Sequence, residues 1–136
     1  LNLNINDLRK NWLILAEKNF KIDKDVEKMI KSLSKKYFVG CLTNITSLHN
    51  IVRKKHKIYN NFRINLISFE QKIKKPDINF YKLILKKTNL NPEDILFIDD
   101  YKPYLVPARK IGMKTILFKN KKDFVSKLRD FNINEF

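Results

Sequence analysis

Short apolar runs alternate along the chain with longer stretches in which apolar residues recur at helical spacing. The short runs, at residues 37–42, 62–69, 95–98 and 115–118, indicate strands. Runs of this kind are typical of strands buried on both faces of a parallel sheet. The helical stretches have these apolar residues on one face: Leu8, Trp12, Leu15 and Ala16; Val26, Met29, Ile30 and Leu33; Phe80, Leu83 and Ile84; Phe124, Val125, Leu128 and Phe131. The pattern predicts an α/β fold with a Rossmann-like, doubly wound parallel sheet.

Two adjacent carboxylates, Asp99 and Asp100, follow the run at residues 95–98 directly. In open α/β sheets, ligands bind just outside the carboxyl ends of the strands. Two acidic side chains at that position repel each other and favour a nearby cation. Mg²⁺ suits oxygen ligands at such a strand end, because it binds through one or two carboxylates and keeps several waters. The alternative is a helix N-cap followed by a solvated acid.

A hydroxyl and an amine precede this acidic pair in the chain. Thr43 and Asn44 directly follow the apolar run at residues 37–42. Lys75 comes just before Pro76 and a helical stretch that starts at Asp77. On a parallel sheet these positions can converge on one edge. A hydroxyl donor, a cationic amine and a divalent ion can together hold a transferring phosphoryl group. The alternatives are an N-cap for Thr43 and a solvated side chain for Lys75.

In the order Thr, Lys, Asp-Asp, these residues resemble the haloacid dehalogenase (HAD) superfamily of phosphohydrolases, from about residue 26 to residue 118. Thr43 and Asn44 look like its second motif, Lys75 like its third, and Asp99 with Asp100 like its fourth. The resemblance implies that Thr43 and Asn44 bind the phosphoryl group and position the substrate. It also implies that Lys75 neutralises crowded anions, and that Asp99 and Asp100 bind Mg²⁺.

The family's first motif, a strand ending in Asp-x-Asp that carries the nucleophile, has no counterpart before Thr43. Asp23 and Asp25 mimic it, but residues 18–22 make a poor buried strand, and Asp23 is better placed as an N-cap. We therefore expect a fragment in which residues 1–22 end a helical cap and residues 23–136 form a partial core. In the resembled family the missing strand is central. Its absence would leave two strand edges, through which the chain dimerises or takes up a complementing segment.

Composition changes this picture little. The chain has 136 residues, 43% of them hydrophobic, enough for one ordinary core. No apolar stretch is long enough for a membrane span. The single cysteine, Cys41, lies in an apolar run, which favours a core role over a catalytic thiol and predicts a reducing, cytoplasmic setting.

The chain departs from the family's fourth motif at Tyr104, where close relatives of the family carry Asn. Tyr104 is flanked by Pro103 and Pro107, so we expect a reshaped loop there.

The net charge of +15 would attract phosphate or nucleic acid, but the lysines are spread evenly and no nucleic-acid motif is present. We therefore expect no specific nucleic-acid partner. The resemblance implies a Mg²⁺-dependent, phosphatase-like hydrolase of a small phosphorylated metabolite that works through an aspartyl-phosphate intermediate. This chain alone, without a nucleophile segment, is expected to be inactive. Two alternatives stay open: a non-catalytic interaction or regulatory remnant of the fold, and a basic nucleic-acid-associated domain.

Overall fold

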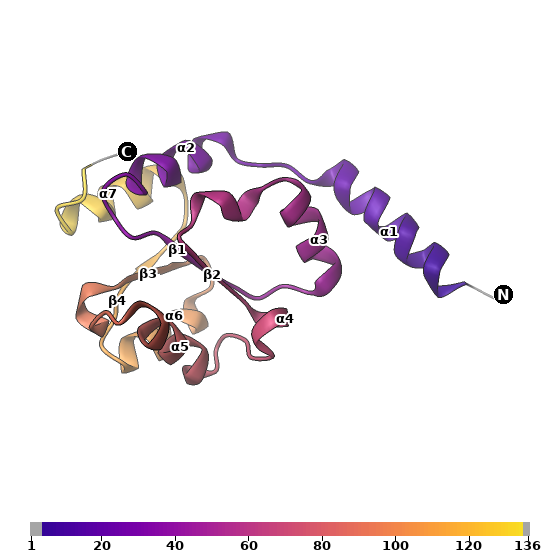
Figure 1. The fold of residues 1–136 in the computed structure, drawn as a ribbon. Helices are drawn as coiled ribbons and strands as arrows, with labels where there is room; N and C mark the ends of the chain where they lie inside the picture. Colours follow the sequence, from indigo (N-terminus) through magenta and orange to yellow (C-terminus); the bar gives the residue numbers. More distant parts are fainter. Residues whose placement is uncertain (1–3, 135–136) are drawn as a thin grey trace.

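The computed structural model describes residues 4–134, which form an α/β domain (Figure 1). The strands are β1 (Gly40–Thr43), β2 (Ile64–Ile67), β3 (Leu96–Asp99) and β4 (Lys114–Leu117). The α-helices are α1 (Ile5–Asn19), α2 (Lys24–Leu33), α3 (Ser47–Lys55), α4 (Ser68–Gln71), α5 (Ile78–Thr88), α6 (Lys102–Lys110) and α7 (Lys121–Asp130). Two 3₁₀ turns, η1 (Ile58–Asn61) and η2 (Pro92–Asp94), complete the order. None of the described helices is long and apolar enough to cross a membrane.

The four described strands form two separate parallel pairs. β1 pairs with β2, from Gly40 opposite Ile64 to Thr43 opposite Ile67. β3 pairs with β4, from Leu96 opposite Lys114 to Asp99 opposite Leu117. The parallel α/β class is confirmed, and the sheet is divided between β1 and β3, where the resemblance places the missing strand.

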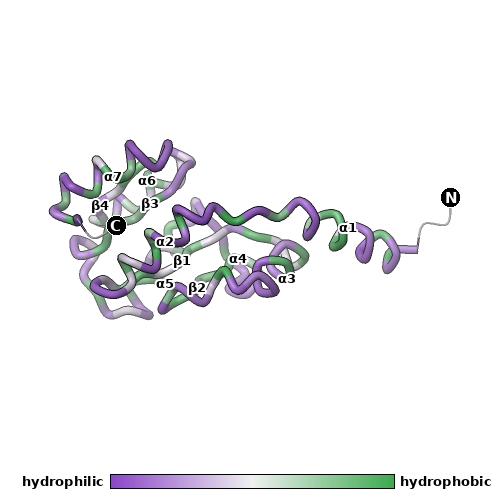
Figure 2. The backbone as a smooth tube through the Cα atoms, turned by 90° about the horizontal axis from the view of Figure 1, so that it is seen from above, coloured by the Kyte–Doolittle hydropathy of each residue, from purple (hydrophilic) through white to green (hydrophobic). Residues whose placement is uncertain are grey.

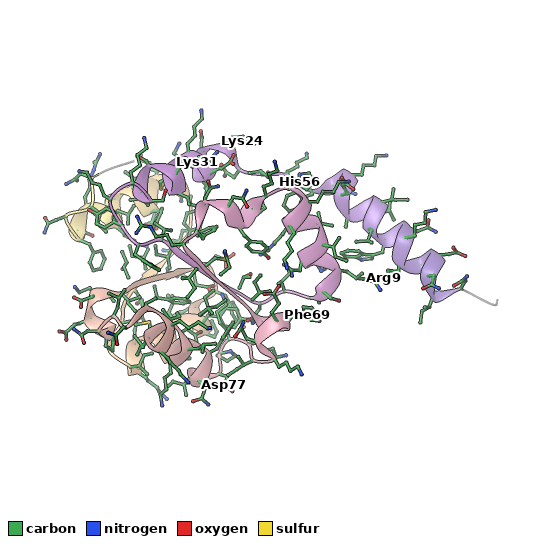
Figure 3. The ribbon with its side chains drawn as sticks, in the orientation of Figure 1. Arg9, Lys24, Lys31, His56, Phe69 and Asp77 are labelled. Atoms are coloured by element: carbon green, nitrogen blue, oxygen red, sulfur yellow. The ribbon has the colours of Figure 1, made fainter. Side chains whose placement is uncertain are left out.

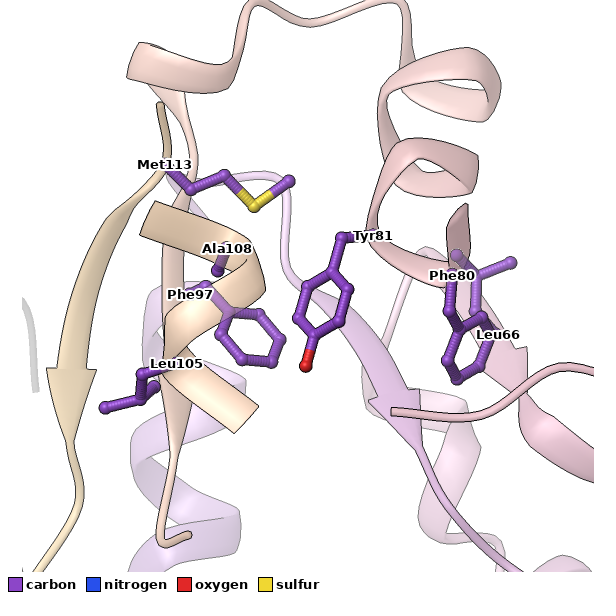
Figure 4. Close-up of a cluster of buried hydrophobic side chains, with 7 residues drawn as sticks. All are labelled: Leu66, Phe80, Tyr81, Phe97, Leu105, Ala108 and Met113. Carbon is purple, nitrogen blue, oxygen red and sulfur yellow. The ribbon is translucent and has the colours of Figure 1, made fainter. Parts of the chain in front are cut away.

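Helices cover both faces of the strands: α2 and α7 lie on one side, and α5 and α6 lie on the other (Figure 1). Each side has its own apolar cluster. The residues of the α5–α6 cluster are Leu66, Phe80, Tyr81, Phe97, Leu105, Ala108 and Met113 (Figure 4). The residues of the α2–α7 cluster are Met29, Ile116, Phe124 and Leu128. The inward positions expected for α5 and α7 are therefore confirmed, whereas the buried ring of Tyr81 was not expected.

Aspartates start two of the helices. The Asp23 side chain accepts hydrogen bonds from the backbone N–H groups of Asp25 and Val26, and so caps α2. Asp77 caps α5 in the same way, through the N–H of Asn79. The N-cap interpretation of Asp23 is confirmed, and this carboxylate is not at the end of a strand.

Two chain segments differ from expectation. The strand expected at residues 62–69 is confirmed as β2 but is shorter, because Ser68 turns the chain: its hydroxyl accepts from the N–H of Ile45 and donates to the same residue's carbonyl. The reshaped loop expected after β3 is instead helix α6. Pro103 lies in its first turn, where no N–H is needed, and the helix tolerates Pro107 in its interior.

Helix α1 extends away from the rest of the domain (Figures 1 and 2). None of its described residues is buried, and Leu15 is 60% exposed, so the apolar stripe predicted for this helix does not enter the core. Its contact is with α3, where the ring of Trp12 meets that of His49 edge to face, with 4.6 Å between centroids. The division into a cap remnant at residues 1–22 and a core at residues 23–136 stays a prediction.

Cys41 lies on β1 and is a free, partly buried thiol. Burial raises the pKa of this thiol, although the charges of Arg53 and Lys75 oppose the effect. Because the thiolate is the reactive form, a raised pKa lowers the reactive fraction at any pH below it. We expect the pH–rate profile of iodoacetamide alkylation to be displaced to higher pH than that of N-acetylcysteine. A profile displaced to lower pH would contradict this prediction and indicate an activated cysteine.

Candidate functional site

The carboxyl ends of β1 and β3 meet at Lys75. The Asn44 side chain, just after β1, forms two hydrogen bonds with the backbone of Lys75: its Nδ2 donates to the carbonyl oxygen at 2.9 Å, and its Oδ1 accepts from the N–H at 2.8 Å. The Lys75–Pro76 peptide bond is cis. These bonds fix the segment before α5 against the end of β1.

The Lys75 side chain then reaches the end of β3. Its Nζ donates to Asp99 Oδ2 at 2.5 Å, and the two side chains are only 9% and 6% exposed. The other oxygen, Oδ1, accepts from the N–H of Tyr101 at 3.0 Å. A buried ion pair of this kind is held by geometry and hydrogen bonds, because the loss of hydration offsets much of the Coulomb attraction. Three of the predicted residues, Asn44, Lys75 and Asp99, therefore form one continuous polar chain.

Thr43 ends β1 at the same edge and has a partner that the sequence did not reveal. The Arg53 guanidinium, on α3, donates from Nη1 to Thr43 Oγ1 at 3.0 Å. Arg53 thus brings a second cation to the edge that holds Lys75. The sequence carried no signal for this contact, because Arg53 is one of several basic residues in α3.

Asp100 follows Asp99 but is exposed. Among the described residues no group of three or more acidic, histidine or cysteine side chains gathers to form a full metal shell. Asp99 and Asp100 nevertheless fit a hard cation such as Mg²⁺, which is often bound by one or two carboxylates with water as its other ligands. The donor set is thus suitable for Mg²⁺ and unsuitable for softer metals, since nitrogen and sulfur ligands are lacking in this set.

Tyr104, the residue at which the sequence departs from the family pattern, borders the site. Its hydroxyl oxygen lies 3.1 Å from Asn44 Nδ2, which donates to it, and its ring centroid lies 4.8 Å from Lys75 Nζ. The Tyr81 hydroxyl donates to the Tyr104 backbone carbonyl at 2.6 Å and holds the start of α6. The aromatic ring faces the ammonium group in a cation–π geometry. Tyr104 is therefore an integral part of the site, which the sequence indicated only as a departure.

The polar residues His49 and Glu70 lie outside this chain of contacts. His49 is exposed and contacts Thr46 and Trp12. Glu70 lies in α4, where its hydrogen bond from Lys54 lowers the pKa of the carboxyl group. Both observations agree with surface roles.

At one edge of two parallel strand pairs, the domain therefore presents a hydroxyl, an amide, two cations and two carboxylates. Thr43 Oγ1 and Lys75 Nζ can donate to an anion, while Asp99 balances the charge of Lys75. This combination suits a phosphate group, whose oxygens need donors and positive charge. Fold and site together define a doubly wound α/β protein with a cluster of polar and charged side chains at its strand ends.

The model of one protein family, described as haloacid dehalogenase-like hydrolase, matches residues 2–118. This chain belongs to that family. It is 38% identical over 55 residues to drimenol cyclase drtB of Aspergillus calidoustus, covering 40% of the chain and 10% of that protein. It is 27% identical over 110 residues to flavin mononucleotide hydrolase 1 of Arabidopsis thaliana, covering 80% of the chain and 45% of that protein.

A solved structure has the same fold. It is a HAD family enzyme of Bacteroides thetaiotaomicron in complex with magnesium and inorganic phosphate, with a TM-score of 0.75 and 22% identity. The match covers 86% of this chain and 62% of the solved one. The chain thus spans less than half the length of the two curated relatives and less than two thirds of this structure.

Proposed function

We propose that this chain supplies one half of the active site of a Mg²⁺-dependent phosphohydrolase that acts on a small phosphorylated metabolite. The observation that carries the proposal is the polar chain Asn44–Lys75–Asp99, with Thr43 beside it, at the carboxyl ends of two parallel strands. The magnesium and phosphate in the solved relative, and the name of the flavin mononucleotide hydrolase, support the same chemistry.

In this proposal each residue acts through the atoms that it presents. Thr43 Oγ1 donates to a phosphoryl oxygen, and Asn44 keeps the Lys75 backbone in place. Lys75 Nζ offsets the negative charge that gathers around the transferring group. Asp99, and Asp100 directly or through water, would hold Mg²⁺, which supplies charge stabilisation for the phosphoryl oxygens when bound.

The proposed reaction needs a carboxylate nucleophile from outside residues 4–134. In the first step its oxygen bonds to phosphorus, the ester P–O bond breaks, and the leaving oxygen takes a proton. In the second step water attacks the aspartyl phosphate, whose P–O bond breaks to release inorganic phosphate and regenerate the carboxylate. Among the described residues, Asp99 and Asp100 are the carboxylates at this edge, and Asp23 caps α2. Residues 1–136 alone are therefore expected to lack turnover.

The direct test compares the full-length protein with purified residues 1–136. Phosphate release from p-nitrophenyl phosphate and from flavin mononucleotide would be measured with Mg²⁺ and with EDTA. We expect Mg²⁺-dependent release from the full-length protein and none from residues 1–136. A folded full-length protein that releases no phosphate from either compound would favour the second candidate, a non-catalytic remnant that keeps the fold for an interaction.

The nucleic-acid alternative predicts a different result. Of the basic side chains labelled in Figure 3, Arg9 projects from α1, whereas Lys24 and Lys31 project from α2. We expect weak binding to DNA and RNA oligonucleotides without sequence preference, because counterion release supplies nearly all the affinity. Binding would be measured by fluorescence anisotropy at salt concentrations from low to physiological. The logarithm of the association constant should fall steeply as the logarithm of the salt concentration rises. Tight, salt-resistant binding to one oligonucleotide would instead support a nucleic-acid function.

A further inference from the structure

Arg53 is a half-buried cation at the strand ends to which the proposed function gives no role. It lies in the last turn of α3, and its Nη1 donates to Thr43 Oγ1 at 3.0 Å. Within residues 4–134 no carboxylate forms an ion pair with its guanidinium group. The positive charge of Arg53 is therefore not neutralised by a described side chain.

The other basic residues of this turn differ from Arg53 in both respects. Lys54 and Lys55 are exposed, and each pairs with a carboxylate: Lys54 Nζ lies 2.8 Å from Glu70 Oε1, and Lys55 pairs with Glu17. Exposed pairs of this kind contribute little energy. Of the three neighbouring cations, Arg53 is thus the one directed at the strand ends.

The contact with Arg53 determines how the Thr43 hydroxyl can act. A threonine hydroxyl has one hydrogen to donate and two lone pairs, whereas a guanidinium group has only donors. Thr43 Oγ1 must therefore accept from Arg53, and its own hydrogen is directed elsewhere. Among the described side chains and backbone groups, no acceptor receives this hydrogen. The hydroxyl is a donor without an acceptor, at the edge where Lys75 Nζ also lies.

The surroundings of the guanidinium group show that it points inward, beneath α3. The Tyr59 side chain is 9% exposed, and its burial raises the pKa of its hydroxyl, an effect that the charge of Arg53 opposes. The same charge opposes the rise in the pKa of Cys41, two residues before Thr43 on β1. Side chains two residues apart on a strand lie on the same face. In such a partly buried setting a charge acts more strongly than it does in water.

We propose that Arg53 is a positioning residue of the phosphate site, which acts through Thr43 by turning the hydroxyl hydrogen toward a phosphoryl oxygen and strengthening that hydrogen bond. The inference rests on the proposed function, in which Thr43 donates to the phosphoryl group. A donor that itself accepts from a cation is polarised, because hydrogen bonds in a chain reinforce one another. Hydrogen bonds to an ionised acceptor such as phosphate are also the stronger ones.

The matched variants are Arg53→Met and Lys54→Met in the full-length protein. Each removes one positive charge from the last turn of α3, but only Arg53 contacts Thr43. We expect kcat/KM for p-nitrophenyl phosphate to fall about tenfold in Arg53→Met, the usual effect of losing a hydrogen bond to a charged group. It should change by less than about twofold in Lys54→Met. Binding of inorganic phosphate, measured by isothermal titration calorimetry with Mg²⁺, should weaken by a similar factor in Arg53→Met and stay unchanged in Lys54→Met.

A double-mutant cycle with Thr43→Val separates positioning from a structural role. Valine keeps the branched shape of threonine and removes the hydroxyl. In the Thr43→Val background, Arg53→Met should lower kcat/KM by less than about twofold further, because the group through which Arg53 acts is already absent. A residue that only holds α3 against β1 would cause the same loss in both backgrounds.

Arg53→Lys provides a second series should Arg53→Met not unfold cooperatively. Lysine keeps the charge and loses the rigid, planar donor fork. We expect a smaller loss of kcat/KM than in Arg53→Met, and this loss should also disappear in the Thr43→Val background.

The outcomes separate this inference from the proposed function. If the wild type releases phosphate but Arg53→Met and Lys54→Met lose equally, or if the Arg53→Met loss persists undiminished beside Thr43→Val, the inference is wrong and the proposed function stands. If the wild type binds phosphate without turnover and only Arg53→Met weakens the binding, the positioning role holds and the hydrolase proposal is wrong. A wild-type protein that neither binds nor releases phosphate would overturn both.

Discussion

Replacing Lys75 with methionine will lower the kcat of the full-length protein by about 10²-fold or more, the loss seen when other preorganised charge-stabilising donors are removed. Methionine keeps most of the length of the side chain and removes only the charge and the donors. Lys75 Nζ is the group that neutralises Asp99 in the buried pair, so no other described side chain can replace it there. The measurement is steady-state release of phosphate from p-nitrophenyl phosphate at saturating Mg²⁺.

Lys74→Met is the matched control, because Lys74 is the exposed neighbour of the buried Lys75. It should retain wild-type kcat within about twofold, because surface charges contribute little energy. Lys75→Met will also destabilise the domain, by about 3–5 kcal/mol, the usual cost of leaving one member of a buried ion pair unpaired. The thermal unfolding of each variant therefore has to be measured beside its kinetics. The activity assay has to be run well below the midpoint temperature of unfolding of the variant. Near-normal turnover in a folded Lys75→Met protein would exclude a role for this ammonium in the reaction.

The second large effect is expected at Asp99. Asp99→Asn keeps the shape of the side chain and an oxygen that can accept from the Tyr101 N–H, but removes the negative charge. We expect the Mg²⁺-dependent turnover of the full-length protein to fall below detection over a full Mg²⁺ titration, because a neutral amide is a far weaker ligand for a hard cation.

Asp100→Asn separates the two carboxylates. Asp100 is exposed, so this variant should keep measurable turnover and require more Mg²⁺ for half-maximal activity. If Asp99→Asn retained wild-type turnover, the metal assignment would have no basis. If Asp100→Asn instead lost all activity, both carboxylates would be direct ligands, and the exposed position of Asp100 would have to change on metal binding.

The sequence predicted the part of the site that depends on chain order. Strand ends on a parallel sheet lie at one edge, so Asn44, Lys75 and Asp99 could be placed together from their positions after or before regular elements. The gap in the sheet was predicted for a similar reason, because no counterpart of the family's first motif was recognised before Thr43 and the strand of that motif is central in the family. The division between β1 and β3 agrees with this expectation.

The rest of the site depends on long side chains and on turns, which a single sequence specifies poorly. Arg53 reaches Thr43 from the last turn of α3. The spacing along the chain does not distinguish Arg53 from the other basic residues of that helix as the partner of Thr43. Tyr104 meets Asn44 from the first turn of α6, in a segment where the prolines argued for a reshaped loop. The strand at β2 ended early because the Ser68 hydroxyl bonds to the backbone of Ile45 across the turn, a tertiary contact.

The pair of bonds between Asn44 and the Lys75 backbone has a consequence for the chemical ageing of the protein. One bond uses the amide as a donor and the other uses it as an acceptor. Deamidation to aspartate would replace the donor with a second acceptor that faces the Lys75 carbonyl oxygen, so one bond would become a repulsion. The β-branched Ile45 that follows slows this hydrolysis relative to a glycine. Slow loss of activity on storage would be assigned to Asn44 only where peptide mapping places the new carboxylate at residue 44.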